Sequence, residues 1–255
     1  MTQRPDFLSQ PKYVIYGGAF DPPHVGHVGC VEKILDRFPE AHVIVTPTPH
    51  PPRTAHGTKG VCSPFDARSS MCRHAFQDLG ARVEVSEIEA SLPPPQYTVS
   101  TLRTLEKRLP GPFGLMIGQD QLEQFPLWRE PLEILKRASL VIIARPRDGE
   151  TSSNLVNQKG QLLEAVRTIA EKLELNAEWL EDSREARLLA PKDGWSASIF
   201  FLPGSVGAFS SSHIREQLSR QEVETIVGIP KNVARFIREH GLYQQVKFKT
   251  NAKDL

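Results

Sequence analysis

The stretch Tyr13-Val14-Ile15-Tyr16-Gly17-Gly18-Ala19-Phe20-Asp21-Pro22-Pro23-His24-Val25-Gly26-His27 changes character twice along its length. It starts with an apolar run from Tyr13 to Tyr16, which is typical of a buried strand. Two glycines and a proline turn end that run. Apolar residues then recur at helical spacing, namely Val25, Val28, Val31, Ile34 and Leu35. The stretch predicts a strand, a tight loop and a helix.

The same alternation continues through the first 145 residues and resumes near the C-terminal end. The predicted strands are His42 to Thr46, Val83 to Ile88, Phe113 to Ile117, Leu140 to Ala144 and Ile199 to Leu202. The predicted helices are Ser63 to Gly80 and Thr98 to Leu109, each with a hydroxyl cap, and then Leu132 to Ala138, Ser212 to Leu218 and Val233 to His240. Alternating strands and helices indicate an α/β fold, with a doubly wound parallel sheet, helices on both faces and a C-terminal helical region.

The segment from Arg147 to Ser196 breaks this alternation. It contains a polar loop, an acidic stretch from Glu181 to Glu185 and an amphipathic helix with Leu162, Val166, Ile169 and Leu173. We interpret residues 147–196 as an inserted or extended segment, or a lid, within a single domain that spans residues 10–245. The basic tail, residues 246–255, is expected to be frayed.

Composition excludes several classes of protein. The 255 residues carry a formal net charge of +1, which gives no basic field for nucleic-acid binding. Only three cysteines occur, so a disulfide framework is not expected. A reducing, cytoplasmic location is expected instead. No apolar run approaches the roughly 20 residues that span a membrane, so no membrane partner is expected. Oligomeric state is left open, with a homo-oligomer as one alternative.

The loop after the first strand has the chemistry of an anion site. Free N–H groups and the helix dipole favour an anion where a strand leads into a helix. The glycines Gly17 and Gly18 allow the main chain close to a phosphate, and His24 and His27 lie on one face of the first helical turn. Either half alone is better explained as a glycine-bearing turn or as surface histidines, whereas the two together are much more specific.

The stretch resembles the G-G-T-F-D-P-x-H-x-G-H signature of the H-x-G-H nucleotidyltransferases, with Ala19 in place of Thr. Their second signature, I-S-S-T-x-I-R, is similar to residues 209–215, with Ser212 in place of Thr. The resemblance implies a Rossmann-like fold in which His24, His27 and Arg215 are catalytic. It further implies an ATP site that includes Gly17, Gly18, Ala19, Phe20, His24, His27, Gly118, Asp120, Ser210, Ser212 and Arg215.

Within that superfamily, residues 13–243 resemble the bacterial nicotinate-nucleotide adenylyltransferases. Ser63 to Met71 keeps the pattern S-x-x-x-x-R-x-x-M, residues 97–102 keep Y-T-x-x-T-L, and residues 118–128 keep G-x-D-x-x-x-x-F-P-x-W. The resemblance implies that Asp120 holds the adenosine ribose, that Trp128 stacks on the pyridine ring, and that Tyr97 and Thr98 bind the pyridine carboxylate. Arg53 stands where the family's P-P-H-[KR] loop has its His, and we assign it to the mononucleotide phosphate.

The implied reaction is adenylyl transfer from ATP to nicotinate mononucleotide, which gives deamido-NAD and pyrophosphate in NAD biosynthesis. The mononucleotide phosphate is already an anion and needs no general base, so catalysis reduces to alignment and charge stabilisation. No acidic cluster for a protein-held metal is seen, so Mg²⁺ is expected on the ATP phosphates. The alternatives are an enzyme that prefers the amide mononucleotide, another H-x-G-H nucleotidyltransferase, and a non-catalytic nucleotide-binding module.

Overall fold

The computed structural model describes residues 10–50, 62–143, 155–180, 185–202 and 209–243. Its centre is an eight-stranded sheet in the order β3-β2-β1-β4-β5-β8-β7-β6. The strands are β1 Tyr13–Gly18, β2 His42–Pro47, β3 Val83–Val85, β4 Phe113–Gly118, β5 Ala138–Ile143, β6 Asn176–Leu180, β7 Glu185–Ala190 and β8 Trp195–Leu202. The pairs from β3 to β8 are parallel, which confirms the predicted parallel sheet.

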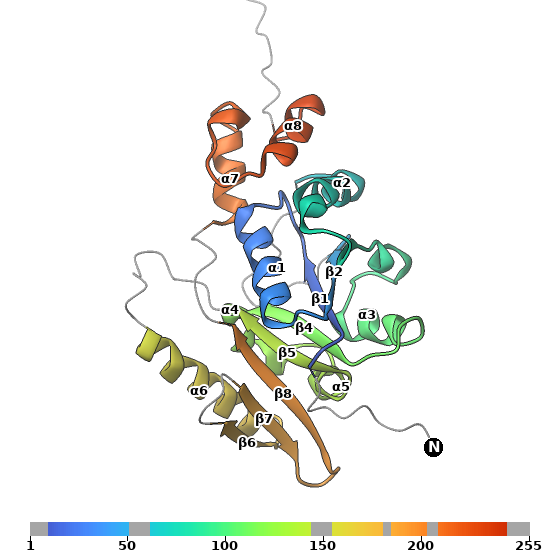
Figure 1. Cartoon of the computed structure of the whole chain (residues 1–255), viewed down its shortest axis with the longest axis vertical. Helices are drawn as coiled ribbons and strands as arrows, with labels where there is room; N and C mark the ends of the chain where they lie inside the picture. Colours follow the sequence, from blue (N-terminus) through green and yellow to red (C-terminus); the bar gives the residue numbers. More distant parts are fainter. Residues whose placement is uncertain (1–9, 51–61, 144–154, 181–184, 203–208, 244–255) are drawn as a thin grey trace, which may run out of the picture.

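Helices cover both faces of the sheet (Figure 1). They are α1 Val25–Arg37, α2 Phe65–Phe76, α3 Thr98–Leu105, α4 Gln119–Leu122, α5 Pro131–Arg137, α6 Leu155–Lys172, α7 Ser211–Leu218 and α8 Lys231–Glu239. Short 3₁₀ turns lie between them, η1 Gln77–Leu79, η2 Ile88–Ser91, η3 Phe125–Leu127 and η5 Val223–Thr225. Among the described residues, none of these helices is long and apolar enough to cross a membrane.

The strands bury side chains on both faces, because successive residues point to opposite sides. Ile15 and Leu115 pack with α3, α5 and α6 in one core. Val14 and Met116 pack with α1, α2, α7 and α8 in the other. Two cores on one sheet are what a doubly wound fold requires, and the near-continuous apolar strands of the sequence follow from it.

Two strands of the sheet, β6 and β7, were not predicted from the sequence. β6 and β7 form an antiparallel hairpin that extends the sheet beyond β8, and β8 starts at Trp195 rather than at Ile199. β7 alternates half-buried and buried residues, but two of its three buried residues are alanines, Ala186 and Ala190, which are not typical of strands. The hairpin and α6 contribute Leu188 and Ile169 to the first core. Residues 155–180 and 185–196 thus contribute to the sheet and its core, whereas residues 147–154, 181–184 and the tail 246–255 lie outside the described residues.

Several element boundaries also differ from the prediction. β3 ends at Val85, and Ile88 lies in η2. Pro64 and Tyr97, rather than Ser63 and Thr98, are the cap residues of α2 and α3, and neither of those helices has a side-chain cap hydrogen bond. α3 ends at Leu105, before Leu109. Ser63 and Thr98 therefore predicted the presence of these two helices correctly, but they are not the cap residues.

Candidate functional site

The candidate site lies at the carboxyl ends of β1 and β4. The chain leaves β1 toward β2 on one side, while β4 pairs with β1 on the other, so this is the topological switch point of the sheet. Ligands of open α/β sheets bind in the crevice outside such a point. Gly17 and Gly18 end β1, and Gly118 ends β4, so three of the predicted site residues meet here.

The turn after β1 is shaped by Gly18 and Phe20. Phe20 is buried and adopts φ 49°, in the left-handed region that favours glycine. Its ring lies so close to Gly18 that a Cβ there would come within 3.1 Å of it. The same ring makes edge contacts with Tyr16 at 5.2 Å and with His27 at 5.0 Å between centroids. The Phe20 ring therefore packs against both Gly18 and His27 and fixes the shape of the turn.

The geometry fixes the proton on His27. The backbone N–H of His24 donates to Nδ1 of His27 at 3.1 Å. A ring nitrogen that accepts a hydrogen bond carries no proton, so the neutral ring holds its proton on Nε2. The two imidazoles stack with centroids 3.7 Å apart. His27 is thus held as an Nε2 donor, which is the form that an anionic ligand needs.

Fewer main-chain N–H groups are available to an anion at the start of α1 than its sequence predicts. The N–H of Val25 donates to the carbonyl of Gly228 at 2.8 Å, so the protein itself satisfies one of the first donors. Gly228 has φ +99°, and a Cβ there would lie 2.4 Å from the ring of Phe209. Only glycine fits at this position, for which no role was predicted from the sequence. Donation to an anion here depends on the remaining main-chain groups and on the histidine side chains.

The second signature packs directly on the first. Ser211 Oγ donates to the carbonyl of Pro22 at 3.0 Å, and Arg215 Nη1 donates to the carbonyl of Asp21 at 2.7 Å. Arg215 Nη2 also donates to Ser212 Oγ at 3.3 Å. Ser210 caps α7 by accepting the N–H of His213 at 3.1 Å. Two segments nearly two hundred residues apart therefore form one surface, with Ser210 and Ser212 exposed on it.

Arg68 is the Arg of the S-x-x-x-x-R-x-x-M pattern, for which the sequence predicted no role. Its side chain is buried, and its Nη1 donates to the carbonyls of Ala19 at 2.6 Å and Thr48 at 2.9 Å. The remaining guanidinium nitrogens donate to the carbonyls of Pro49 at 3.3 Å and Ser63 at 3.2 Å. Burial lowers the pKa of Arg68, while the Asp21 carboxylate opposes that shift. One guanidinium thus joins the loops after β1 and β2 to the start of α2.

Asp21 connects the same loop to the end of the described chain. Its carboxylate accepts the Tyr243 hydroxyl at 2.7 Å and the N–H of Cys62 at 2.6 Å. Burial raises the pKa of Tyr243, and the Asp21 charge adds to that effect, so the phenol stays protonated and donates. Asp21 is itself buried, so these bonds satisfy a carboxylate that water does not reach. The sequence offered no signal for a contact across 222 positions.

The predicted mononucleotide residues come from two other segments. Tyr97 is the cap residue of α3 and Thr98 its first helical residue, so the N–H of Thr98 has no acceptor inside the helix. The preceding Gln96 is buried, and its Oε1 accepts the N–H of His50 at 2.9 Å. Trp128 directly follows η3 and is half-buried, with its ring 5.5 Å from that of Phe125. These segments provide a helix start and a flat ring on the α3 side of the sheet.

The remaining predicted residues have simpler surroundings. Asp120 is exposed in α4, the short helix that directly follows Gly118. Its carboxylate accepts a hydrogen bond from Gln121 at 3.0 Å. Its carboxylate lies outside the carboxyl end of β4, where the ribose was expected. Arg53 lies outside the described residues.

The comparisons with known proteins point to one family. Residues 15–217 match the model of a family described as cytidylyltransferase-like. A probable nicotinate-nucleotide adenylyltransferase of Dehalococcoides mccartyi is 32% identical over 90% of this chain and 95% of its own length. Another, of Rhodopirellula baltica, is 38% identical over 52% of this chain and 61% of that relative, less than two thirds of its length.

The solved structures show the fold. Plasmodium falciparum nicotinic acid mononucleotide adenylyltransferase complexed with NaAD is 17% identical, with a TM-score of 0.58, and the match covers 91% of this chain and 96% of that one. Fold and site together define a nucleotidyltransferase. The chain belongs to the cytidylyltransferase-like family and, within it, to the nicotinate-nucleotide adenylyltransferases, as the sequence predicted.

Proposed function

We propose that this protein transfers the adenylyl group of ATP to nicotinate mononucleotide, forming deamido-NAD and pyrophosphate. A phosphate oxygen of the mononucleotide attacks the α-phosphorus, a new P–O–P link forms, and the bond to the β-phosphate breaks. The observation that carries the proposal is the contact of Arg215 and Ser211 with the Asp21–Pro22 backbone. It joins both phosphate signatures into one surface at the switch point of the sheet.

The proposed catalytic residues act on the triphosphate. His27 Nε2 and the His24 ring donate to its oxygens, and Arg215 with the Ser210 and Ser212 hydroxyls stabilises the charge that develops on the leaving pyrophosphate. Gly17, Gly18, Ala19 and Phe20 provide the main-chain surface against which the phosphates lie. Because the donors are fixed before ATP binds, little reorganisation is needed during the reaction.

The proposed substrate residues lie on either side of the phosphates. Gly118 and Asp120 bind the adenosine ribose, Trp128 stacks on the pyridine ring, and the N–H groups at Tyr97 and Thr98 bind its carboxylate. Arg53 is proposed for the mononucleotide phosphate. The acid is favoured over the amide because a helix start attracts an anion, whereas the NH₂ of a carboxamide would face donors.

Enzymes of this class use a divalent cation with ATP, and we propose Mg²⁺. Among the residues that the structure describes, no group of three or more His, Cys, Asp or Glu side chains could hold a metal ion. Phosphate and water oxygens are the ligands that suit Mg²⁺ in such a setting. The cation would therefore be delivered with ATP and would neutralise phosphate charge. A cytoplasmic location is part of the proposal, since ATP is supplied there.

The test is turnover of ATP and Mg²⁺ with either mononucleotide, following pyrophosphate release and the dinucleotide by chromatography. We expect kcat/KM for the acid to exceed that for the amide by about tenfold or more, from dipole and charge-assisted hydrogen bonds together. Equal values, or a preference for the amide, would overturn the substrate assignment alone. Absence of any dinucleotide product would contradict catalysis and favour a nucleotide-binding module.

A further inference from the structure

Glu130 has a backbone conformation that its residue type does not favour. Its φ is +53° and its ψ 58°, in the left-handed region where glycine is the usual residue. It lies two positions after Trp128 and directly before α5, and its carbonyl accepts the N–H of Ile134 at 3.1 Å. A non-glycine residue persists in such a position only when its surroundings hold it there. The surroundings of Glu130 therefore need an explanation.

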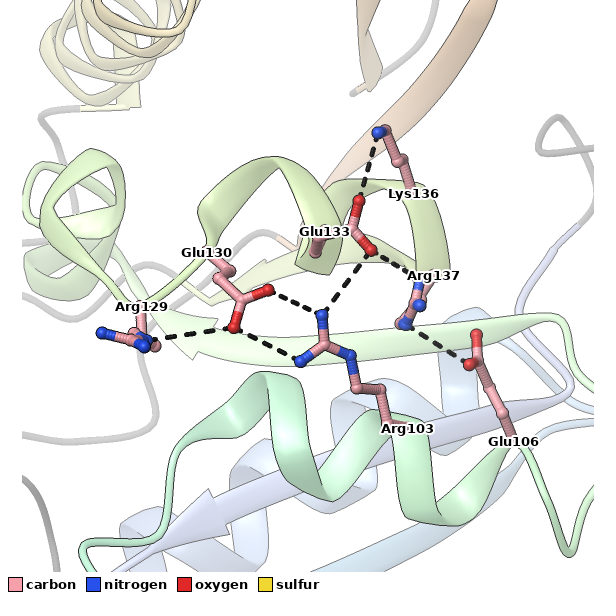
Figure 2. A network of polar contacts seen from close by, with 7 residues as sticks. All are labelled: Arg103, Glu106, Arg129, Glu130, Glu133, Lys136 and Arg137. Carbon is pink, nitrogen blue, oxygen red and sulfur yellow. Dashed lines mark hydrogen bonds and ion pairs between the residues drawn. The ribbon is translucent and has the colours of Figure 1, made fainter.

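Arg103 of α3 holds the Glu130 carboxylate at two points (Figure 2). Its Nη2 donates to Oε2 at 2.6 Å and its Nη1 to Oε1 at 3.3 Å. This two-point geometry fixes direction as well as distance, which a single contact does not. The hydrogen bond from Arg103 also lowers the pKa of Glu130, so the carboxylate is ionised at neutral pH.

A second contact links the same two segments. The guanidinium of Arg129 lies 6.0 Å from the centroid of the Tyr97 ring, and its Nε lies 3.9 Å from Glu130 Oε1. The residues after Trp128 are thus connected to α3 at its first turn through Tyr97 and at its end through Arg103. α3 begins at Thr98, so both connections act on the helix whose start we assign to the pyridine carboxylate.

We propose that the Arg103–Glu130 pair is a positioning device that sets the spacing between Trp128 and the start of α3. It thereby fixes the width of the slot that receives the pyridine ring of the mononucleotide. This inference rests on the proposed function. The pair touches no reacting atom, so its effect is expected on recognition of the mononucleotide and not on the chemistry of the triphosphate.

The neighbouring charges decide which variants are informative. Arg103 Nη2 also lies 3.8 Å from Glu133 Oε2, so an exchange of the two charges would place a carboxylate beside Glu133. Neutral replacements avoid this, and Glu130→Gln, Arg103→Gln and the double variant form a cycle that isolates the pair. Glu130→Gly removes the carboxylate and also places glycine, which favours the left-handed conformation, at that position.

Glu106→Gln is the matched control. Glu106 Oε2 lies 3.3 Å from Arg137 Nε, an ion pair that joins the far end of α3 to the end of α5 in the same network (Figure 2). It links the same two helices without touching the residues after Trp128. A general loosening of α3 against α5 would therefore appear in this variant too.

The experiment measures KM for nicotinate mononucleotide, KM for ATP, kcat and the thermal midpoint of each variant. In Glu130→Gln, Arg103→Gln and Glu130→Gly, we expect KM for the mononucleotide to rise about fivefold, the upper range for an exposed pair. KM for ATP and kcat should stay within about twofold, and the double variant should match the single ones. Glu130→Gly should be as stable as the wild type or more so, because glycine suits its backbone.

Three results would overturn the proposal. They are an unchanged KM for the mononucleotide in Glu130→Gly, an equal rise of both KM values, and an equal effect in Glu106→Gln. A wild-type enzyme that uses neither mononucleotide contradicts the proposed function instead. An active wild type with unaffected variants contradicts only the role of the pair.

Discussion

The two sides of the site are built differently. On the phosphate side, the loop after β1 is fixed by buried groups, since Arg68 and Asp21 are both almost fully buried and make several hydrogen bonds each. On the mononucleotide side, Arg103 and Glu130 retain 40% and 38% of their side-chain exposure. Charges in a buried setting are screened little, whereas exposed ones are screened by water and salt.

This difference matches what each side has to do. Donors that stabilise charge on a leaving group must be preorganised, and a buried frame of hydrogen bonds keeps them in place. A slot for the pyridine ring can be positioned by exposed pairs, each of which contributes little free energy. We therefore expect changes on the phosphate side to affect turnover or stability strongly, and changes on the mononucleotide side to affect recognition of the mononucleotide moderately.

The largest effect is expected for His27→Ala. Loss of one preorganised donor should lower kcat by about 10²-fold or more with the fold unchanged. His27→Asn provides a comparison, since its amide can accept the His24 N–H as Nδ1 does but does not reach as far as Nε2. Steady-state rates at saturating ATP measure the effect. Near-normal turnover in His27→Ala and His24→Ala alike would remove both histidines from the mechanism.

The next largest effect is expected for Arg68→Met, which keeps the volume of the buried side chain but leaves four carbonyls without their donor. Unsatisfied buried polar groups should reduce the free energy of unfolding by about 2–4 kcal/mol. Urea denaturation measures this, with Arg103→Gln as the exposed counterpart at roughly 1 kcal/mol or less. Equal losses in the two variants would remove the contrast between the two sides.

Trp128→Ala is expected to act on both mononucleotides alike. Stacking of a ring on an aromatic side chain is worth about 1–3 kcal/mol, so kcat/KM should fall roughly tenfold for acid and amide. KM for ATP should change little. A loss confined to the acid would show that Trp128 senses the substituent and not the ring.

Thr98→Pro is expected to act on the acid selectively. Proline is tolerated at the first helical position, so α3 should form while losing the N–H of residue 98. Loss of one charge-assisted donor should lower kcat/KM for the acid by about tenfold and leave the amide nearly unchanged. Paired kinetics with the two mononucleotides measure the ratio, and an equal fall for both would place the carboxylate elsewhere.

The smallest effect concerns the buried Glu89, which accepts a hydrogen bond from Thr101 at 2.8 Å. Burial raises the pKa of Glu89, whereas the hydroxyls of Thr101 and Thr48 oppose that shift. Stability from protonated Glu89 is therefore complete below its unfolded pKa and is lost as pH rises through its folded pKa.

Glu89→Gln cannot ionise, so its stability relative to the wild type should increase with pH, by on the order of 1 kcal/mol between about pH 5 and pH 8. Urea denaturation across that range measures the difference. A difference that stays constant with pH would show that Glu89 does not titrate there.

Local pattern predicted much of this molecule. The apolar run at Tyr13, the glycines after it and the helical spacing from Val25 lie close together in sequence, so they predict a strand, a turn and a helix without any distant contact. The hairpin of β6 and β7 was missed because its strands contain no β-branched residue and are defined by the pairing of β7 with β6 and β8 and by packing against α6. Strand propensity depends strongly on such surroundings.

The sequence by itself determined the alternating strands and helices of the parallel part of the sheet, the two phosphate signatures and the family. Only the tertiary structure decided three hydrogen bonds between distant residues. Arg215 donates to the Asp21 carbonyl, Tyr243 donates to the Asp21 carboxylate, and Arg103 donates to the Glu130 carboxylate. The physical reason is that the residues of a signature are close together in the sequence, so local main-chain geometry determines how they are placed. A hydrogen bond between distant residues depends instead on how the strands and helices pack, and no local pattern encodes that packing.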